Sequence, residues 1–376
     1  MPSNEPPEAS PTSPPGEAAV RAHFLAQSKS CRSMGSPFTA GLLETAGERL
    51  STSSRIGATV LRWPGTPSDD ALALRFAAGL HWLALRGGDK ELAELYRERG
   101  IVGQQPSSWK LIEQVLERHG TALMRFIERP PQTNEVGRSA VIFGGFMAVA
   151  ARTGQPLSLR EIGSSAGLNL NWHRYGYCPS GIDLQWGDIE GPVVMRPDWE
   201  GPVPTLANVE VIDGMGCDLN PADYTAITLS SDEPVPSSDE ANRLLAYIWP
   251  DQEERMARMR GALRIAVKHP PIVERESAAA WLGRVVKKQP ADCAQVVFHT
   301  VVWQYLSPDE RSGIKDAIDQ AAAAATTANP FAWLRMEPSE DGGCAELRLT
   351  LWPEDSEIHL ADVCYHGKWI RWFGRE

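Results

Sequence analysis

The sequence predicts an α/β protein in which an all-helical N-terminal subdomain precedes a doubly wound, mostly parallel β-sheet. Up to about residue 150, apolar residues recur at the three- and four-residue spacing of amphipathic helices. From residue 157 onward, short apolar runs alternate with helical patterns, which is the order of βα units. We therefore expect a tail at 1–19, a helical cap at 20–150 and a sheet domain at 151–376.

The composition favours a globular protein of the cytoplasm. Hydrophobic residues make up 42% of the 376 residues, enough for a sizeable core. The net charge of −11 argues against nucleic-acid binding, and no apolar run reaches the roughly 18 residues of a membrane helix. The Pro/Ser/Glu-rich start lacks the features of a signal peptide and predicts a disordered tail. Six scattered cysteines without a C-x-x-C pair indicate reduced thiols.

Helical patterns cover most of the N-terminal part. Gly87 and Gly88 interrupt the longest pattern and predict a break between two helices. The segments expected to be helical are 20–31, 70–100, 107–128 and 138–153.

The C-terminal part begins with a buried strand, LSLREI, and a helix expected over 166–177. An extended, proline-rich excursion follows at about 182–207, and the next core strand ends at Asp218. Pro250 should break or kink the helical stretch that comes next. Two strand–helix units start at residues 272 and 294, and three final strands, the last two as a possible hairpin, complete the sheet.

A turn of small residues follows the first strand, in the order Glu161-x-Gly163-x-Ser165-x-Gly167. Sheets of this class bind ligands beyond the carboxyl ends of their strands, where bare backbone amides are exposed. The dinucleotide fingerprint G-x-G-x-x-G would require glycine at the positions of Ser165 and Leu168, and the phosphate loop G-x-x-x-x-G-K-[ST] is absent. The alternative is a tight turn needed only for packing.

This turn resembles the first motif of class I S-adenosylmethionine-dependent methyltransferases, [D/E]-x-G-x-G-x-G. Glu161, Gly163 and Gly167 match the motif, and Ser165 replaces its central glycine. The resemblance implies a Rossmann-like methyltransferase sheet and S-adenosylmethionine as the cofactor. The cofactor-binding residues expected at the turn are Glu161, Gly163, Ser164, Ser165, Gly167 and Asn169.

The resemblance extends to the next two strands. Asp218 corresponds to the acidic residue that accepts the ribose hydroxyls in the family, and Leu219 follows it. Glu276 and Ser277 stand where the family often places a residue near adenine. The interval before Asp218 exceeds the usual spacing of about 20 residues, so Asp183 is the competing ribose-binding candidate. Asp218 is equally consistent with capping the turn at Asn220–Pro221.

His299 ends the apolar run AQVVFHT and resembles the family's residue at the end of the fourth strand. This position favours a catalytic role as a general base, and the alternative is a core histidine bonded to the backbone. Trp303 and Tyr305 are expected either near the acceptor or in the core of the following helix.

The segment QTNEVGR lies just ahead of the glycine strand and carries several polar groups. Thr133 or Asn134 fits a helix N-cap, and Glu135 suits the positive end of the helix. Asn134, Glu135 and Arg138 are also candidates for a lid over the cofactor cleft.

The predicted function is methyl transfer from S-adenosylmethionine to a small-molecule acceptor. Two alternatives remain: a non-catalytic protein that binds this cofactor or its product, and a scaffold that has lost ligand binding. An uncharacterised bacterial family with the same glycine motif is similar to three segments of this sequence: FLAQSKSCRSMGSPFTAGLL, QTNEVGR and LLAYIWPDQEERMARMRGAL. No metal site is expected, since His359, Cys364 and His366 lack the spacing of a ligand motif.

Overall fold

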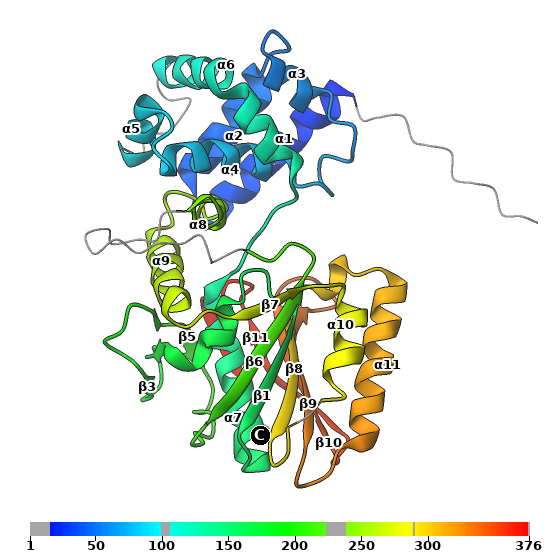
Figure 1. The fold of residues 1–376 in the computed structure, drawn as a ribbon. Coiled ribbons are helices and arrows are strands. Elements are labelled where there is room, and N and C mark those ends of the chain that lie inside the picture. The colour runs from blue at the N-terminus through cyan, green and yellow to red at the C-terminus, as the bar shows by residue number, and fades with distance from the viewer. Residues whose placement is uncertain (1–15, 99–105, 223–237, 289, 375–376) are drawn as a thin grey trace, which may run out of the picture. The chain divides into compact units, whose positions relative to one another are not determined.

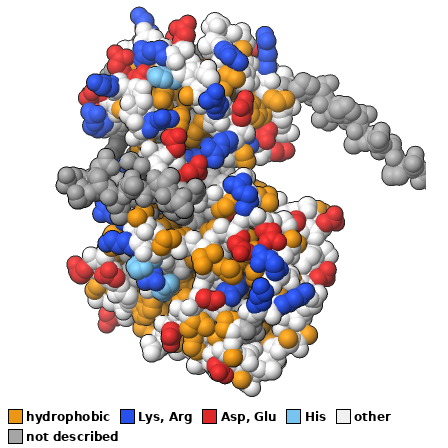
Figure 2. Space-filling model, viewed as in Figure 1, with side chains coloured by type: hydrophobic (Ala, Val, Ile, Leu, Met, Phe, Trp, Pro, Cys, Tyr) orange, Lys and Arg blue, Asp and Glu red, His pale blue; other side chains and the backbone are white. Residues whose placement is uncertain are grey.

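The computed structural model describes residues 16–98, 106–222, 238–288 and 290–374 (Figure 1). The chain forms two compact units. The helical unit contains the chain up to Pro131 together with Leu245–Glu253, and the sheet unit contains Gln132–Leu244 and Glu254–Glu376. On the face shown in Figure 2, basic and acidic side chains are interspersed over both units.

The helical unit is built around α4, whose sequence LALRFAAGLHWLAL is apolar on nearly every side. Residues of α4 from Leu72 to Ala84 are largely buried, and the other helices pack around them. A break at Gly87–Gly88 separates α4 from α5, as the sequence predicted. The helices are α1 (Glu17–Ser33), α2 (Pro37–Arg49), α3 (Arg55–Leu61), α4 (Leu72–Leu85), α5 (Lys90–Glu98) and α6 (Pro106–Glu128).

The sheet unit contains a nine-stranded, mixed and mostly parallel sheet with the order β5-β12-β11-β10-β9-β8-β1-β6-β7. Strands β7, β6, β1, β8 and β9 are parallel, and β9 to β12 form an antiparallel meander. The strands are β1 (Leu157–Ile162), β5 (Asp198–Glu200), β6 (Val211–Asp218), β7 (Ile272–Arg275), β8 (Ala294–Thr300), β9 (Phe331–Pro338), β10 (Ala345–Trp352), β11 (Ser356–Val363) and β12 (Trp369–Trp372). The predicted α/β class is confirmed.

Helices cover both faces of this sheet. Helix α7 (Ser139–Thr153) packs so closely on one face that a Cβ at Gly145 would lie 2.5 Å from the Leu334 side chain. Trp333 directly precedes Leu334 in β9, so its side chain points to the other face of the sheet. There it borders the core beneath α10 (Ala278–Val285) and α11 (Pro308–Ala324). Figure 1 shows α10 and α11 side by side. Helix α7 packs on the sheet and is part of the sheet unit, so the first boundary between the two units follows residue 131 and not the predicted residue 150.

The helix expected over 166–177 is absent from that segment. A 3₁₀ helix, η2 (Leu168–Arg174), is followed by strand β2 (Gly176–Tyr177). The hydroxyl of Tyr175 donates to the carbonyl of Leu168 at 2.6 Å, and that of Tyr177 donates to the carbonyl of Trp172 at 2.8 Å. These two hydrogen bonds tie Tyr175 and Tyr177 back to η2 at the point where the chain leaves the helical turn for β2.

The remaining connections agree with most of the sequence-based expectations. The excursion forms a small sheet of β2, β3 (Trp186–Gly187) and β4 (Val194–Met195), and its last part, β5, joins the edge of the large sheet. Helices α8 (Asp239–Ala246) and α9 (Glu253–Lys268) are separated near Pro250.

Two boundaries differ from those expectations. The expected last strand is a pair, β11 and β12, because the chain turns at Gly367 with φ of +66°. Helix α1 begins at Glu17, inside the expected tail, whose residues 1–15 lie outside the described residues. Within the described ranges, no helix combines the length and apolar character needed to cross a membrane.

Candidate functional site

The carboxyl ends of the parallel strands meet at one edge of the sheet. From β1 the chain passes first to β6 on one side, and later, from β7 to β8, it crosses to the other side. The topological switch point therefore lies between β1 and β8. This edge carries Glu161, Asp218, His299 and also Glu337, which the sequence reasoning did not single out.

The turn after β1 has an unusual backbone. Gly163, Ser165 and Gly167 have φ of +64°, +54° and +68°, a region that favours glycine. A Cβ at Gly163 would lie 2.4 Å from Cγ2 of Val302, so the loop after β8 packs directly on this glycine. Ser165 tolerates its conformation while its Oγ accepts a hydrogen bond from Nε2 of Gln132 at 3.0 Å. Backbone strain of this kind is typical of functional sites.

Ser164 and Asn169 serve the turn itself. The Ser164 backbone N–H donates to the carbonyl of Cys217 at 3.0 Å, which joins the turn to β6. Asn169 is buried, and its Oδ1 accepts from the hydroxyl of Ser139 at 2.8 Å. The Asn169 side chain also hydrogen-bonds the carboxyl group of Glu161. Both residues therefore fix the shape of the turn from within.

Glu161 is a buried acid with an oxygen that lacks a partner. Its exposed fraction is 2%, and within the described part of the chain its Oε2 makes no hydrogen bond. Burial raises the pKa of Glu161 well above its ordinary value, although the nearby Arg138 acts in the opposite direction. A buried, unpaired carboxyl oxygen at a strand end is a feature that a ligand bearing a hydrogen-bond donor would satisfy.

Asp218 connects the turn to β6. Its Oδ2 accepts the backbone N–H of Ser165 at 3.0 Å, and its Oδ1 accepts the backbone N–H of Asn220 at 2.8 Å. The capping alternative for Asp218 is therefore confirmed. Because each carboxylate oxygen has a second lone pair and Asp218 is half-buried, it still has capacity to accept hydroxyl groups.

The other expected cofactor contacts lie at various distances from this centre. Leu219 is 67% exposed directly after Asp218. Glu276 follows β7, and an oxygen of its carboxylate lies 2.5 Å from Nη2 of Arg284. Ser277 precedes α10 as its N-cap residue without a side-chain cap bond. Asp183 is exposed in the connection from β2 to β3, away from the ends of the large-sheet strands.

Both ring nitrogens of His299, the expected general base, have partners in this arrangement. Nε1 of Trp333, which is only a donor, donates to Nε2 of His299 at 3.1 Å. The proton of the neutral ring therefore lies on Nδ1, which donates to Oε1 of Glu337 at 2.6 Å. Both nitrogens are engaged and the side chain is 1% exposed, so no lone pair is free for a substrate proton. The core-histidine alternative is the better description, with side-chain partners in place of backbone.

Glu337, at the end of β9, organises the loop after β8. Its carboxylate accepts the backbone N–H groups of Val302 at 3.0 Å and Trp303 at 3.2 Å. These bonds support Val301, whose φ of +54° is strained for a β-branched residue. The sequence does contain a signal for Glu337. It is an acidic residue near the end of the apolar strand FAWLRMEP, just as Glu161 is at the end of LSLRE.

Trp303 and Tyr305 lie in a short 3₁₀ helix, η3 (Trp303–Tyr305), ahead of α11. The ring of Trp303 stacks on His299 with centroids 5.4 Å apart. Tyr305 is 77% exposed, so the expectation of a core position for Tyr305 is wrong. Because Tyr305 is exposed, its ring can contact a ligand at the ends of the strands.

The expected lid segment contacts the glycine turn. Oδ1 of Asn134 accepts the backbone N–H of Leu168 at 3.0 Å, and Glu135, not Thr133 or Asn134, caps the short helix η1 (Val136–Arg138). The guanidinium of Arg138 donates to the carbonyl of Thr300 at 2.8 Å, at the end of β8. These bonds make the segment a fixed wall of the site.

Glu135 is held by two arginines of α9. Its carboxylate lies 2.5 Å from Nη2 of Arg255 and 3.9 Å from Nη1 of Arg258. Burial alone would raise the pKa of Glu135, but Arg255, His366, Arg138 and the backbone N–H of Gly137 together outweigh it, and the pKa lies below its ordinary value. The pKa of Glu135 is therefore shifted in the opposite direction to that of Glu161, and the carboxylate of Glu135 anchors α9 to the wall.

The fold and this edge define an α/β protein whose parallel strands present a glycine-containing turn and three acidic side chains, Glu161, Asp218 and Glu337, at the edge that contains a topological switch point. The chain belongs to the family described as "Uncharacterized protein conserved in bacteria (DUF2332)", which matches residues 21–372. The resemblance to an uncharacterised bacterial family is thereby confirmed. No curated protein matches the chain.

Proposed function

We propose that the protein binds S-adenosylmethionine at the carboxyl ends of β1 and β6 and transfers its methyl group to a small molecule. The observation that carries this proposal is the turn Glu161–Gly167, in which the backbone of Ser165 is bonded to Asp218 at the end of the neighbouring strand. The parallel order β7-β6-β1-β8-β9 supports the Rossmann-like methyltransferase topology that the turn implies.

The residues at this edge suit the cofactor in three respects. Oε2 of Glu161 lacks a partner within the described residues and would accept a hydrogen bond from the ligand. Asp218 retains lone pairs for the ribose hydroxyls. Leu219 is exposed and offers an apolar contact for the adenine ring. Ser165 stands where the motif has its central glycine, so its side chain leaves the cofactor less space beside the turn than a glycine would.

The side chains at this edge would mainly bind and orient the cofactor and the acceptor, and they would not transfer protons. S-adenosylmethionine supplies the activated methyl group when it is bound. With both nitrogens of His299 engaged, the acceptor must present an atom whose lone pair is already free. Catalysis would then come from aligning that atom with the methyl group and excluding water from the edge. The wall formed by Asn134 and Arg138 would contribute to that exclusion.

Calorimetric titration with S-adenosylmethionine and S-adenosylhomocysteine tests the binding site. We expect both ligands to bind the wild type and the control variant Asp183→Asn equally. Glu161→Gln and Asp218→Asn should weaken binding at least tenfold, since a ligand donor at Oε2 would favour an ionised Glu161, which glutamine cannot provide, and Asp218→Asn loses one of the two oxygens that would accept the ribose hydroxyls. Absence of binding by the folded wild type, or equal binding by all variants, would overturn the proposal.

A non-catalytic role in binding the same cofactor is the second candidate. The engagement of His299 favours it, because a binding protein needs no base at the strand ends. Formation of S-adenosylhomocysteine in the presence of a panel of small acceptors separates the two candidates. Product formation supports the transferase, and tight binding without turnover over the whole panel supports the binding protein.

A further inference from the structure

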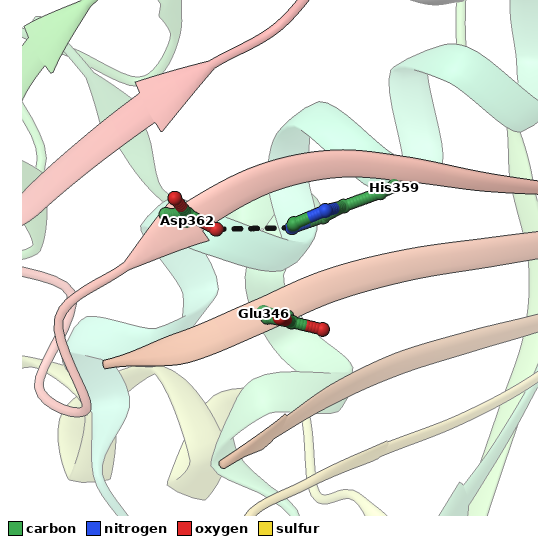
Figure 3. A group of neighbouring side chains, drawn as sticks. All are labelled: Glu346, His359 and Asp362. Atoms are coloured by element: carbon green, nitrogen blue, oxygen red, sulfur yellow. Dashed lines mark ion pairs between the residues drawn. The ribbon is translucent and has the colours of Figure 1, made fainter. Parts of the chain in front are cut away.

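Three side chains capable of binding a metal converge on the C-terminal meander (Figure 3). Glu346 comes from β10, and His359 and Asp362 come from β11. One ligand atom of each lies within 4.8 Å of those of the other two, and all three residues are half-buried. Together they present one imidazole and two carboxylates.

A β-bulge brings these residues to one face. Glu346 is opposite Asp362, but Arg348 is opposite His359, so the register shifts by one residue between the two pairs. In a regular strand, residues three apart point to opposite faces. The shift leaves the buried Leu360 and Ala361 between the two ligands and turns both ligands outward. A bulge that re-aims side chains in this way is typical of functional positions.

The geometry of His359 and Asp362 suits a shared ion better than a direct bond. Nε2 of His359 lies 3.0 Å from Oδ1 of Asp362, yet this atom makes no hydrogen bond of acceptable geometry within the described residues. Two ligands of a tetrahedral zinc ion lie about 3.4 Å apart, since each is about 2.1 Å from the ion. The ring of Phe373 packs edge-on against His359 at 4.9 Å and fixes its orientation.

Glu346 can join the other two ligands without leaving a charge unpaired. Its carboxylate now accepts from Nε of Arg348 at 2.7 Å. Arg348 also donates from Nη1 to Glu357 at 3.1 Å, so it keeps an acidic partner when Glu346 turns toward the ion. The long side chain of Glu346 needs only a rotation about its terminal bonds.

We propose that Glu346, His359 and Asp362 bind a divalent first-row transition metal ion, with water completing its coordination. The imidazole ligand favours ions such as Zn²⁺ and Co²⁺ over Mg²⁺ and Ca²⁺, which prefer oxygen ligands alone. The site clamps β10 to β11 and leaves coordination positions open to solvent. It is independent of the methyltransferase proposal.

Titration of the full chain with Co²⁺, followed by visible absorption, tests this site, and calorimetry with Zn²⁺ and Mg²⁺ tests its selectivity. We expect one equivalent of Co²⁺ to give a ligand-field spectrum that Zn²⁺ abolishes and equimolar Mg²⁺ does not. His359→Gln and Asp362→Asn should each weaken binding at least tenfold. Cys364→Ser is the matched control, because Cys364 is a nearby potential ligand outside the group, and it should bind as the wild type does.

Circular dichroism of the metal-free variants checks that each is folded. Two results would overturn the proposal: failure of the folded wild type to bind Co²⁺ or Zn²⁺ at millimolar concentration, or binding that survives in folded His359→Gln and Asp362→Asn. Loss of binding in Cys364→Ser alone would assign the ion to a thiol and would also refute the group proposed here.

Discussion

Replacing Glu161 with glutamine should stabilise the protein and at the same time weaken ligand binding. Burial raises the pKa of Glu161 well above its ordinary value of 4.5, so the folded state keeps a proton that the unfolded chain releases. The wild type therefore loses stability as pH rises from 4.5 until the pH passes the pKa of the folded state. The slope is about 1.4 kcal/mol per pH unit, and glutamine, which does not titrate, avoids it.

The magnitude follows from that slope. Near pH 4.5 both side chains are neutral in the folded state, and the variant and the wild type should differ little in stability. As pH rises above 4.5, the free energy of unfolding of Glu161→Gln should exceed that of the wild type by a margin that grows along this slope and levels off once the pH passes the pKa of the folded state. Other titrating groups contribute equally to both proteins, so the difference between the two curves isolates Glu161.

Urea denaturation at several pH values between about 4.5 and 8 measures this difference. Glu340→Gln is the control, because Glu340 is an exposed glutamate on the connection from β9 to β10. A difference for Glu161→Gln that stays flat, or that falls as pH rises, would refute the buried, neutral state of this acid. A variant that is more stable but no longer binds S-adenosylmethionine would separate a lost ligand contact from misfolding.

Three further substitutions test the surroundings of the site. Gly163→Ala should cost about 2 kcal/mol of stability, because its backbone is left-handed and the new Cβ would clash with the loop after β8. Gly154→Ala is the control, because Gly154 has the same φ of +64° but open space around it, and it should cost about 1 kcal/mol. Equal shifts of the two variants in thermal unfolding would contradict this expectation. Glu337→Gln should weaken the tryptophan signal in near-ultraviolet circular dichroism, because the β8 loop loses its carboxylate anchor; an unchanged spectrum would argue against that role. Glu135→Gln should cost about 3 kcal/mol at pH 7 by removing the negative charge of the buried ion pair with Arg255. Because the pKa of Glu135 is lowered, this cost should fade as pH falls through the folded-state pKa, and urea denaturation at pH 7 and pH 3 would expose a cost that persists.

The sequence predicted the parallel strands well because their signal is local. Strands β1 and β8 are buried along their whole length, and the apolar residues in each, such as Leu157 and Leu159 in β1 or Val296 to Phe298 in β8, are bounded by turns. The helix expected over 166–177 is replaced by η2 and β2, and the hydroxyl groups of Tyr175 and Tyr177 bond back to carbonyls of η2. Those bonds depend on tertiary packing, which the helical spacing of the segment does not report.

The site was predictable in position more than in role. The small residues of the turn lie at the edge where the parallel strands end, and Asp218 is hydrogen-bonded to them. The role of His299 depends on Trp333 and Glu337, which follow it by 34 and 38 positions. No spacing in the sequence shows that both of its nitrogens are occupied, since that depends on how β8 and β9 lie next to each other.

The pairing of β5 with β12 has a consequence for the order in which the chain folds. Arg371 and Glu200 are neighbours in this parallel pair although they are 171 positions apart, and the rings of Trp199 and Trp372 meet at 5.5 Å. Closing so long a loop is slow, so this edge of the sheet forms late. Until β5 pairs with it, β12 exposes a row of unpaired amides. The state most prone to aggregation is therefore expected late in folding, when the rest of the sheet can already be in place.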